Sequence, residues 1–147
     1  MTPTVELRPT EPADRPYVET ILDANGLPVA DLDEAIDDLY IAEGPSGRVG
    51  VGGLEQYGEN ALLRSVAVEE SVRGKGYGTT ICERLLDRAR ADGVTRVYLL
   101  TTTAAEFFAD LGFDETDRET VPESIQHTTE FSDLCPSTAT CMKRDLD

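Results

Sequence analysis

The sequence predicts an α+β fold built from seven strands and four helices. Apolar residues alternate in some segments and recur every three or four positions in others, which are the patterns of strands and helices. These segments follow one another in the order β-α-α-β-β-β-α-β-α-β-β, with turn residues between them. The chain has 147 residues, the length of one domain, so we expect a single domain over 1–147.

In the first half of the chain, two predicted helices separate the first strand from a run of three more. The first helix carries Val18, Ile21 and Leu22 on one face, and Gly26 ends it. Turns that contain glycine lie between the later strands. The predicted boundaries are 5–8 for the first strand, 11–25 and 28–39 for the helices, and 40–43, 48–57 and 61–68 for the next three strands.

The second half begins with a helix whose apolar stripe predicts a buried face. The stripe ends near Gly93 and consists of Ile81, Cys82, Leu85, Leu86 and Ala89. Nearly every residue of the next strand, 95–101, is apolar or β-branched, which predicts a central place in the sheet. The remaining predicted elements are a short helix at 104–111 and strands at 113–117 and 139–144.

A glycine-rich loop joins strand 61–68 to the helix that follows it. It holds three glycines in five residues, and glycine lets backbone N–H groups approach an anion closely. The start of the helix adds free N–H groups and a partial positive charge. The glycine spacing fits neither the dinucleotide fingerprint nor the Walker pattern. The loop nevertheless predicts a phosphate or pyrophosphate site, formed by Arg73, Gly74, Lys75, Gly76, Tyr77, Gly78 and Thr79.

The loop matches the pattern R-x-x-G-x-G through Arg73, Gly76 and Gly78, directly after a V-x-V strand end. In this setting it resembles motif A of the GNAT superfamily of N-acetyltransferases, which wraps the pyrophosphate of acetyl-CoA. Residues 103–113 resemble motif B of the same superfamily. The resemblance implies the GNAT fold, whose mixed, mostly antiparallel sheet splays between its fourth and fifth strands. It also implies acetyl-CoA as cosubstrate.

Further segments sharpen the resemblance within the superfamily. Taken in order, they resemble the arsenic-resistance-associated N-acetyltransferases along nearly the whole chain; the segments are 51–58, 61–65, 98–103, 121–122, 134–137 and 141–142. Residues 100–113 also resemble the catalytic domain of N-acetylglutamate synthase, whose acceptor is an amino-acid α-amine. The chain lacks the arginine-bearing stretch that this enzyme has near its C-terminus, so the identity of the acceptor stays open.

The superfamily resemblance implies additional contacts to acetyl-CoA. The pantetheine arm would pair with the main chain of Val66, Ala67 and Val68 in the manner of an added strand. Phe108 stands where the family usually has a proton-donating tyrosine, so the proton donor to the CoA thiolate is open. For the two phenylalanines of motif B, packing of the helix onto the sheet is the alternative. The remaining cofactor candidates are Thr103, Phe107 and Phe108.

Two charged residues in apolar strands are the catalytic candidates. Many relatives carry a glutamate as general base near the position of Leu62, where leucine cannot serve. Glu55, a carboxylate in an otherwise apolar strand, is the substitute we expect, with an exposed edge position as the alternative. Arg64 could bind a carboxylate of the acceptor, or it could form an ion pair with Glu55. The base could also act through a water molecule.

Composition limits the partners. The net charge of −16 disfavours nucleic acid, since the phosphate backbone repels an acidic surface. Two of the 13 basic residues are lysines, a balance typical of proteins from a salty cytosol, with recruitment of a cationic substrate as the alternative. The chain has no apolar run of about 20 residues for a membrane span. Its three cysteines and single histidine form no metal pattern, and we expect reduced thiols and a cytoplasmic location.

Two classes of function therefore stay open. The first is an acetyl-CoA-dependent N-acetyltransferase acting on a small, amino-acid-like amine by direct attack, without a metal. The second is an acyl-CoA-binding module without catalysis, which the absent tyrosine and glutamate allow. A homodimer is compatible with either class.

Overall fold

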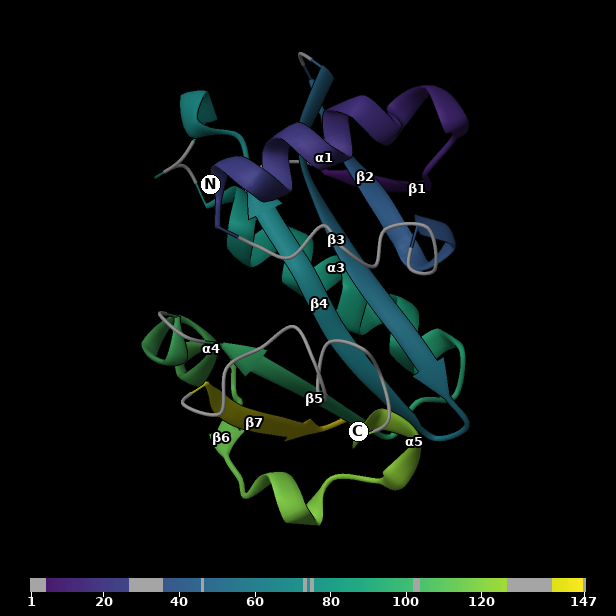
Figure 1. Ribbon diagram of the computed structural model, residues 1–147, viewed down its shortest axis with the longest axis vertical. Helices are drawn as coiled ribbons and strands as arrows, with labels where there is room; N and C mark the ends of the chain where they lie inside the picture. Colours follow the sequence, from purple (N-terminus) through teal and green to yellow (C-terminus); the bar gives the residue numbers. More distant parts are fainter. Residues whose placement is uncertain are drawn as a thin grey trace.

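The fold is built on a seven-stranded sheet. The structure is a computed structural model, and it describes residues 5–26, 36–45, 47–72, 74, 76–101, 104–126 and 139–146. The strands lie in the order β1-β2-β3-β4-β5-β7-β6 (Figure 1). Their bounds are β1 Glu6–Pro9, β2 Leu39–Gly44, β3 Gly47–Tyr57, β4 Asn60–Val68, β5 Arg96–Thr101, β6 Asp114–Glu115 and β7 Thr140–Asp145. The α-helices are α1 Arg15–Ala24, α3 Tyr77–Ala91, α4 Ala105–Asp110 and α5 Glu123–Gln126. Short 3-10 turns occupy η1 Pro12–Asp14, η2 Ile36–Asp38, η3 Glu70–Val72 and η4 Arg118–Thr120.

The sheet is antiparallel at every pairing except β4 with β5, which run parallel. That parallel ladder covers only the first three residues of β4, Asn60 to Leu62, opposite Arg96 to Tyr98. Beyond Leu62 the two strands diverge, and the wedge between them is visible in Figure 1. The predicted mixed sheet with a splay between the fourth and fifth strands is confirmed. Six residues of β4 thus continue past the end of the β5 ladder.

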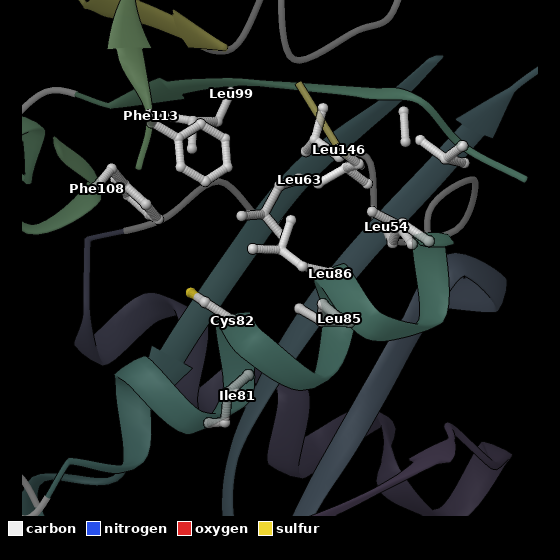
Figure 2. Packing of buried hydrophobic residues seen from close by; sticks show 14 of the residues in the cluster. Leu54, Leu63, Ile81, Cys82, Leu85, Leu86, Leu99, Phe108, Phe113 and Leu146 are labelled. Atoms are coloured by element: carbon white, nitrogen blue, oxygen red, sulfur yellow. The ribbon is translucent and has the colours of Figure 1, made fainter. Parts of the chain in front are cut away.

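Helix α3 covers one face of the sheet. Its apolar stripe packs on side chains of β3, β4 and β5, which alternate toward this face (Figure 2). The residues that meet here include Leu54, Leu63, Ile81, Leu85, Leu86 and Leu99. β3 approaches α3 closely: a methyl group placed on Gly52 would lie 2.7 Å from Cδ1 of Leu85. The glycines of β3 therefore let the helix lie directly on the strand.

The opposite face is covered by α1, which Figure 1 shows in front of the sheet with α3 behind it. Val18, Ile21 and Leu22 of α1 pack on β2, β3 and β4. A third cluster joins the lower part of this face to α5; its buried members are Leu62, Tyr98, Val121, Ile125 and Cys141. Both faces of β4 are therefore buried. Past Leu62, the edge of β4 that faces β5 is not paired with that strand.

Three predicted elements differ from the structure by more than one residue at an end. The predicted helix 28–39 falls mostly outside the described residues, and its last residue, Leu39, begins β2 instead, because it pairs with Gly53 of β3 and is buried there. The first predicted helix starts as the turn η1 before α1. The predicted strand 113–117 shrinks to the exposed edge strand β6. No helix in the described part of the chain is both long and apolar enough to span a membrane.

Candidate functional site

The loop before α3 contains two glycines with left-handed backbone. Gly74 and Gly76 have φ angles of 81° and 86°, in the left-handed region that favours glycine. Gly76 is the N-cap of α3, and its carbonyl accepts hydrogen bonds from the N–H (3.1 Å) and the hydroxyl (3.0 Å) of Thr80. The N–H groups of the first helical turn have no partner within the helix and carry its positive dipole end. Arg73 and Lys75 lie outside the described residues.

The first turn of α3 lies against the end of β4 and against α4. A methyl group placed on Gly78 would be in van der Waals contact with Phe107 at 3.5 Å and Val68 at 3.6 Å, so these elements lie close together. Phe107 is 36% exposed, which leaves an apolar ring at the surface beside the loop. Thr103, the third candidate of motif B, lies outside the described residues.

Phe108 has a different environment from Phe107. It is 9% exposed, and its ring stacks edge-on with Phe107 at 5.1 Å and with Phe113 at 5.8 Å between centroids. Figure 2 shows Phe108 and Phe113 beside Leu99 in the cluster under α3. Phe108 thus packs α4 onto the sheet, which corresponds to the packing alternative in the sequence analysis.

A bulge interrupts β4 in the part that continues past β5. Ala67 pairs with Val51 and Arg64 with Gly53, so three steps along β4 match two along β3. Ser65, inside the bulge, has a φ of 57°, an uncommon value for a residue other than glycine. The side chains of Val66 and Val68 pack on the α3 side and Ala67 on the α1 side. The main chain of residues 66–68 therefore lies along the splayed edge, where an extended ligand could pair with it.

Glu55 and Arg64 meet on the face of the sheet opposite α3. Their relative exposures are 9% and 5%, and Nη1 of Arg64 lies 2.9 Å from Oε2 of Glu55. The hydroxyl of Tyr57 donates a hydrogen bond of 2.6 Å to Oε1 of Glu55. Nε of Arg64 donates one of 3.1 Å to the hydroxyl of Ser65. Glu55 is thus buried, which contradicts the exposed-edge alternative, and Arg64 forms the ion pair.

Tyr57 remains a neutral hydroxyl in this setting. Burial raises its pKa above the ordinary value, and the hydrogen bond and negative charge of Glu55 raise it further. Asp38 in the turn η2 acts in the same direction through its charge, while Arg64 opposes them. Sequence reasoning missed Tyr57, although its spacing of two from Glu55 on a strand places both side chains on one face.

The glycine loop and the Glu55–Arg64 pair lie at the two ends of the part of β4 that continues past the β5 ladder. Glu55 lies opposite Leu62, where the β5 ladder ends, and a methyl group placed on Gly78 would lie 3.6 Å from Val68, where β4 ends. The strand takes six residue steps from Leu62 to Val68, which span roughly 20 Å. A long ligand lying along this edge would reach from one group to the other.

The cysteines in the described part of the chain are unsuited to nucleophilic chemistry. Burial raises the pKa of Cys82 to about 12 and that of Cys141 to about 11, so both stay protonated thiols at neutral pH. Among the described residues, no group of three or more His, Cys, Asp or Glu side chains could hold a metal ion.

Relatives with assigned names share much of this chain. An amino-acid acetyltransferase of Mycobacterium tuberculosis is 36% identical over 110 residues, which cover 72% of this chain and 60% of that protein. The amino-acid acetyltransferase of Neisseria meningitidis serogroup A is 27% identical over 95 residues, 63% of this chain and 22% of that protein. The chain thus spans less than two thirds of the length of these relatives.

Solved structures match the chain over nearly its whole length. Rv2747 from Mycobacterium tuberculosis in complex with CoA and NLQ has 28% identity and a TM-score of 0.80, covering 99% of this chain and 100% of its own. N-acetylglutamate synthase from Neisseria gonorrhoeae, complexed with coenzyme A and N-acetyl-glutamate, has a TM-score of 0.83. Its identity is 21%, and it covers 100% of this chain and 36% of its own, so this likeness shows the fold alone.

A family model places the chain among known domains. The model for the acetyltransferase (GNAT) domain matches residues 35–115, which is more than half of the chain. This match contains β2 to β6, with the splayed edge of β4, the glycine loop and the Glu55–Arg64 pair. The chain belongs to the GNAT acetyltransferase family.

Proposed function

We propose that this chain transfers the acetyl group of acetyl-CoA to the amine of a small, amino-acid-like acceptor. The observation that carries the proposal is the splayed edge of β4, which has an anion loop at one end and a buried Glu55–Arg64 pair at the other. The names of the relatives support an amino-acid acceptor.

In the proposed complex, acetyl-CoA lies along β4. Its pyrophosphate occupies the loop, where the N–H groups of the first turn of α3 and the charges of Arg73 and Lys75 hold it. The pantetheine arm pairs with the main chain of residues 66–68, and Phe107 offers an apolar surface beside it. This order leaves the thioester near the bulge at Ser65, on the strand that carries Arg64.

The proposed reaction is direct attack of a neutral amine on the thioester carbonyl. Glu55 takes one proton from the acceptor ammonium, and Arg64 holds the carboxylate of Glu55 in place. The amine nitrogen forms the new C–N bond and the C–S bond breaks. The nitrogen then loses a second proton, which neutralises the CoA thiolate to the free thiol. Phe108 has no proton to donate, and a thiol of pKa about 8.5 is an adequate leaving group near neutral pH.

The test is release of free CoA thiol from acetyl-CoA against a panel of amino acids, arsenic- and phosphorus-containing analogues, and simple amines in molar potassium chloride. Acceptor-dependent thiol, with the acetylated amine identified by mass, supports the transferase. Tight binding of acetyl-CoA without turnover for any acceptor overturns it in favour of the acyl-CoA-binding module. Thiol release without any acceptor is the control for hydrolysis.

A further inference from the structure

The carboxylate of Glu55 is enclosed by its own partners. Both of its oxygens accept a hydrogen bond, Oε1 from Tyr57 and Oε2 from Arg64, and the residue is 9% exposed. Arg64 is buried still more deeply. An acceptor amine that is to give its proton to Glu55 therefore needs a group that touches the carboxylate and is also within reach from outside.

Tyr57 meets both conditions. It is half-buried, in contrast to Glu55 and Arg64, and its hydroxyl already donates to Glu55 at 2.6 Å. A phenol oxygen that donates its proton keeps its lone pairs for an incoming donor such as an ammonium group. The charges that face this hydroxyl are Glu55 beside it on β3, Asp38 from η2 and Arg64 from β4.

Building on the proposed acetyl transfer, we propose that Tyr57 relays the acceptor's proton to Glu55. One N–H bond of the ammonium breaks as the proton binds Oη of Tyr57, while the phenol proton moves to Oε1 of Glu55. Tyr57 is neutral before and after the step, the amine becomes neutral, and Glu55 becomes a carboxylic acid that returns its proton to water after turnover. The raised pKa of Tyr57 fits this role, because the hydroxyl keeps its proton at working pH.

The test compares Tyr57→Phe with Tyr40→Phe in acetyl transfer from neutral to alkaline pH. Tyr40 is a half-buried tyrosine on β2 that packs on the α3 side, so its variant is a matched control that retains wild-type kcat. Tyr57→Phe keeps the ring and loses the relay, and its kcat should fall by about 100-fold or more at neutral pH, with the KM for acetyl-CoA unchanged. The loss should shrink as the pH approaches the pKa of the acceptor amine, because the neutral amine needs no relay.

A double-mutant cycle separates a relay from a merely structural role. If Tyr57 and Glu55 act as one unit, kcat of Tyr57→Phe/Glu55→Gln should match that of Glu55→Gln alone. Additive losses, or a loss in Tyr57→Phe that is constant across pH, would overturn the relay. Wild-type kcat in Tyr57→Phe would overturn the relay while leaving the acetyl transfer standing. A wild-type chain that releases no thiol with any acceptor would overturn both.

Discussion

At the scale of single residues, the Glu55–Arg64 pair matters for stability as well as for the proposed chemistry. Each charge is compensated by the other at 2.9 Å, in a place that solvent hardly reaches. Removing one partner of a buried pair leaves an uncompensated charge, at a cost of about 3–5 kcal/mol. For substitutions at these two residues, the free energy of unfolding and kcat therefore have to be measured separately.

Glu55→Gln should lower kcat by about 10²–10⁴-fold, because the amide cannot take up a proton, with little change in the affinity for acetyl-CoA. It should also lower the free energy of unfolding, since Arg64 loses its countercharge. Arg64→Met should lower kcat, because it releases the carboxylate of Glu55 from its fixed position. Steady-state kinetics and urea unfolding on the same samples measure both effects.

Glu43→Gln is the matched control for Glu55→Gln. Glu43 forms a strand-to-strand ion pair with Arg8 at 3.2 Å, but its side chain is 43% exposed, and such pairs contribute about 0–1 kcal/mol. The control should leave kcat and stability nearly unchanged. If Glu55→Gln behaves like the control at every pH, Glu55 has no part in the mechanism.

Asp14 is a second buried carboxylate, and it should make stability depend on acid pH. Arg8 donates two hydrogen bonds to it, of 2.7 and 2.9 Å, and lowers its pKa to about 2, against 3.8 in a model compound. A carboxyl group whose pKa is lowered by folding stabilises the fold at pH values above its pKa in the unfolded chain. This contribution to stability disappears as the pH falls from about 4 toward 2. The shift corresponds to about 2 kcal/mol.

Asp14→Asn isolates this contribution from that of the other carboxylates. The difference in free energy of unfolding between the wild type and the variant, measured with urea, should be full at pH 5 and above and should narrow as the pH falls toward 2. A difference that stays constant over this interval would mean that the charge of Asp14 contributes no pH-dependent stability.

At the scale of elements, the start of α3 depends on a left-handed glycine. Gly76→Asp places a carboxylate at the proposed pyrophosphate site. Asp tolerates left-handed backbone better than most residues and suits a helix N-cap, so the helix should still form. We expect the affinity for acetyl-CoA to fall at least tenfold, as measured by calorimetry, because the new charge repels the phosphates.

Gly26→Asp controls for backbone strain in that experiment. Gly26 also has a left-handed φ, 69°, with nothing within 4 Å of a built methyl group, and it follows α1 rather than the loop. The Gly26→Asp variant should lose about as much stability as Gly76→Asp, and it should keep its affinity for acetyl-CoA. Unchanged binding by a folded Gly76→Asp would remove the loop from the cofactor site.

At the scale of the whole molecule, the net charge of −16 should make the stability of the fold depend on salt. Acidic side chains outnumber basic ones 29 to 13, so the compact state repels itself until salt screens the charges. Most ion pairs at the surface leave both partners partly exposed and offset little of this repulsion.

The melting temperature should therefore rise steeply between dilute buffer and molar potassium chloride. For a chain of this size, each 1 kcal/mol of relieved repulsion at the midpoint raises Tm by about 2–4 °C. Calorimetric scans across a potassium chloride series measure Tm at each salt concentration. A flat Tm across the series would mean that the acidic surface serves another purpose, such as recruiting a cationic acceptor.

The sequence by itself determined the order of the strands, the buried stripe of α3 and the glycine loop. Each of these depends on local properties: the period of apolar residues along one segment, and the freedom of glycine to adopt positive φ at Gly74 and Gly76. The motifs around that loop were enough to identify the GNAT fold, including the splay beside β4.

Only the tertiary structure decided how the charged groups meet. The spacing of Glu55, Tyr57 and Arg64 in the sequence is compatible with separate exposed side chains as well as with a buried cluster. The register of β3 against β4, which is regular from the hairpin turn up to the Gly53–Arg64 pair, places Arg64 diagonally across from Glu55 on the same face. In the same way Leu39, at a helical spacing, became the first residue of β2. Burial and bulges depend on contacts between several elements, and no local pattern records them.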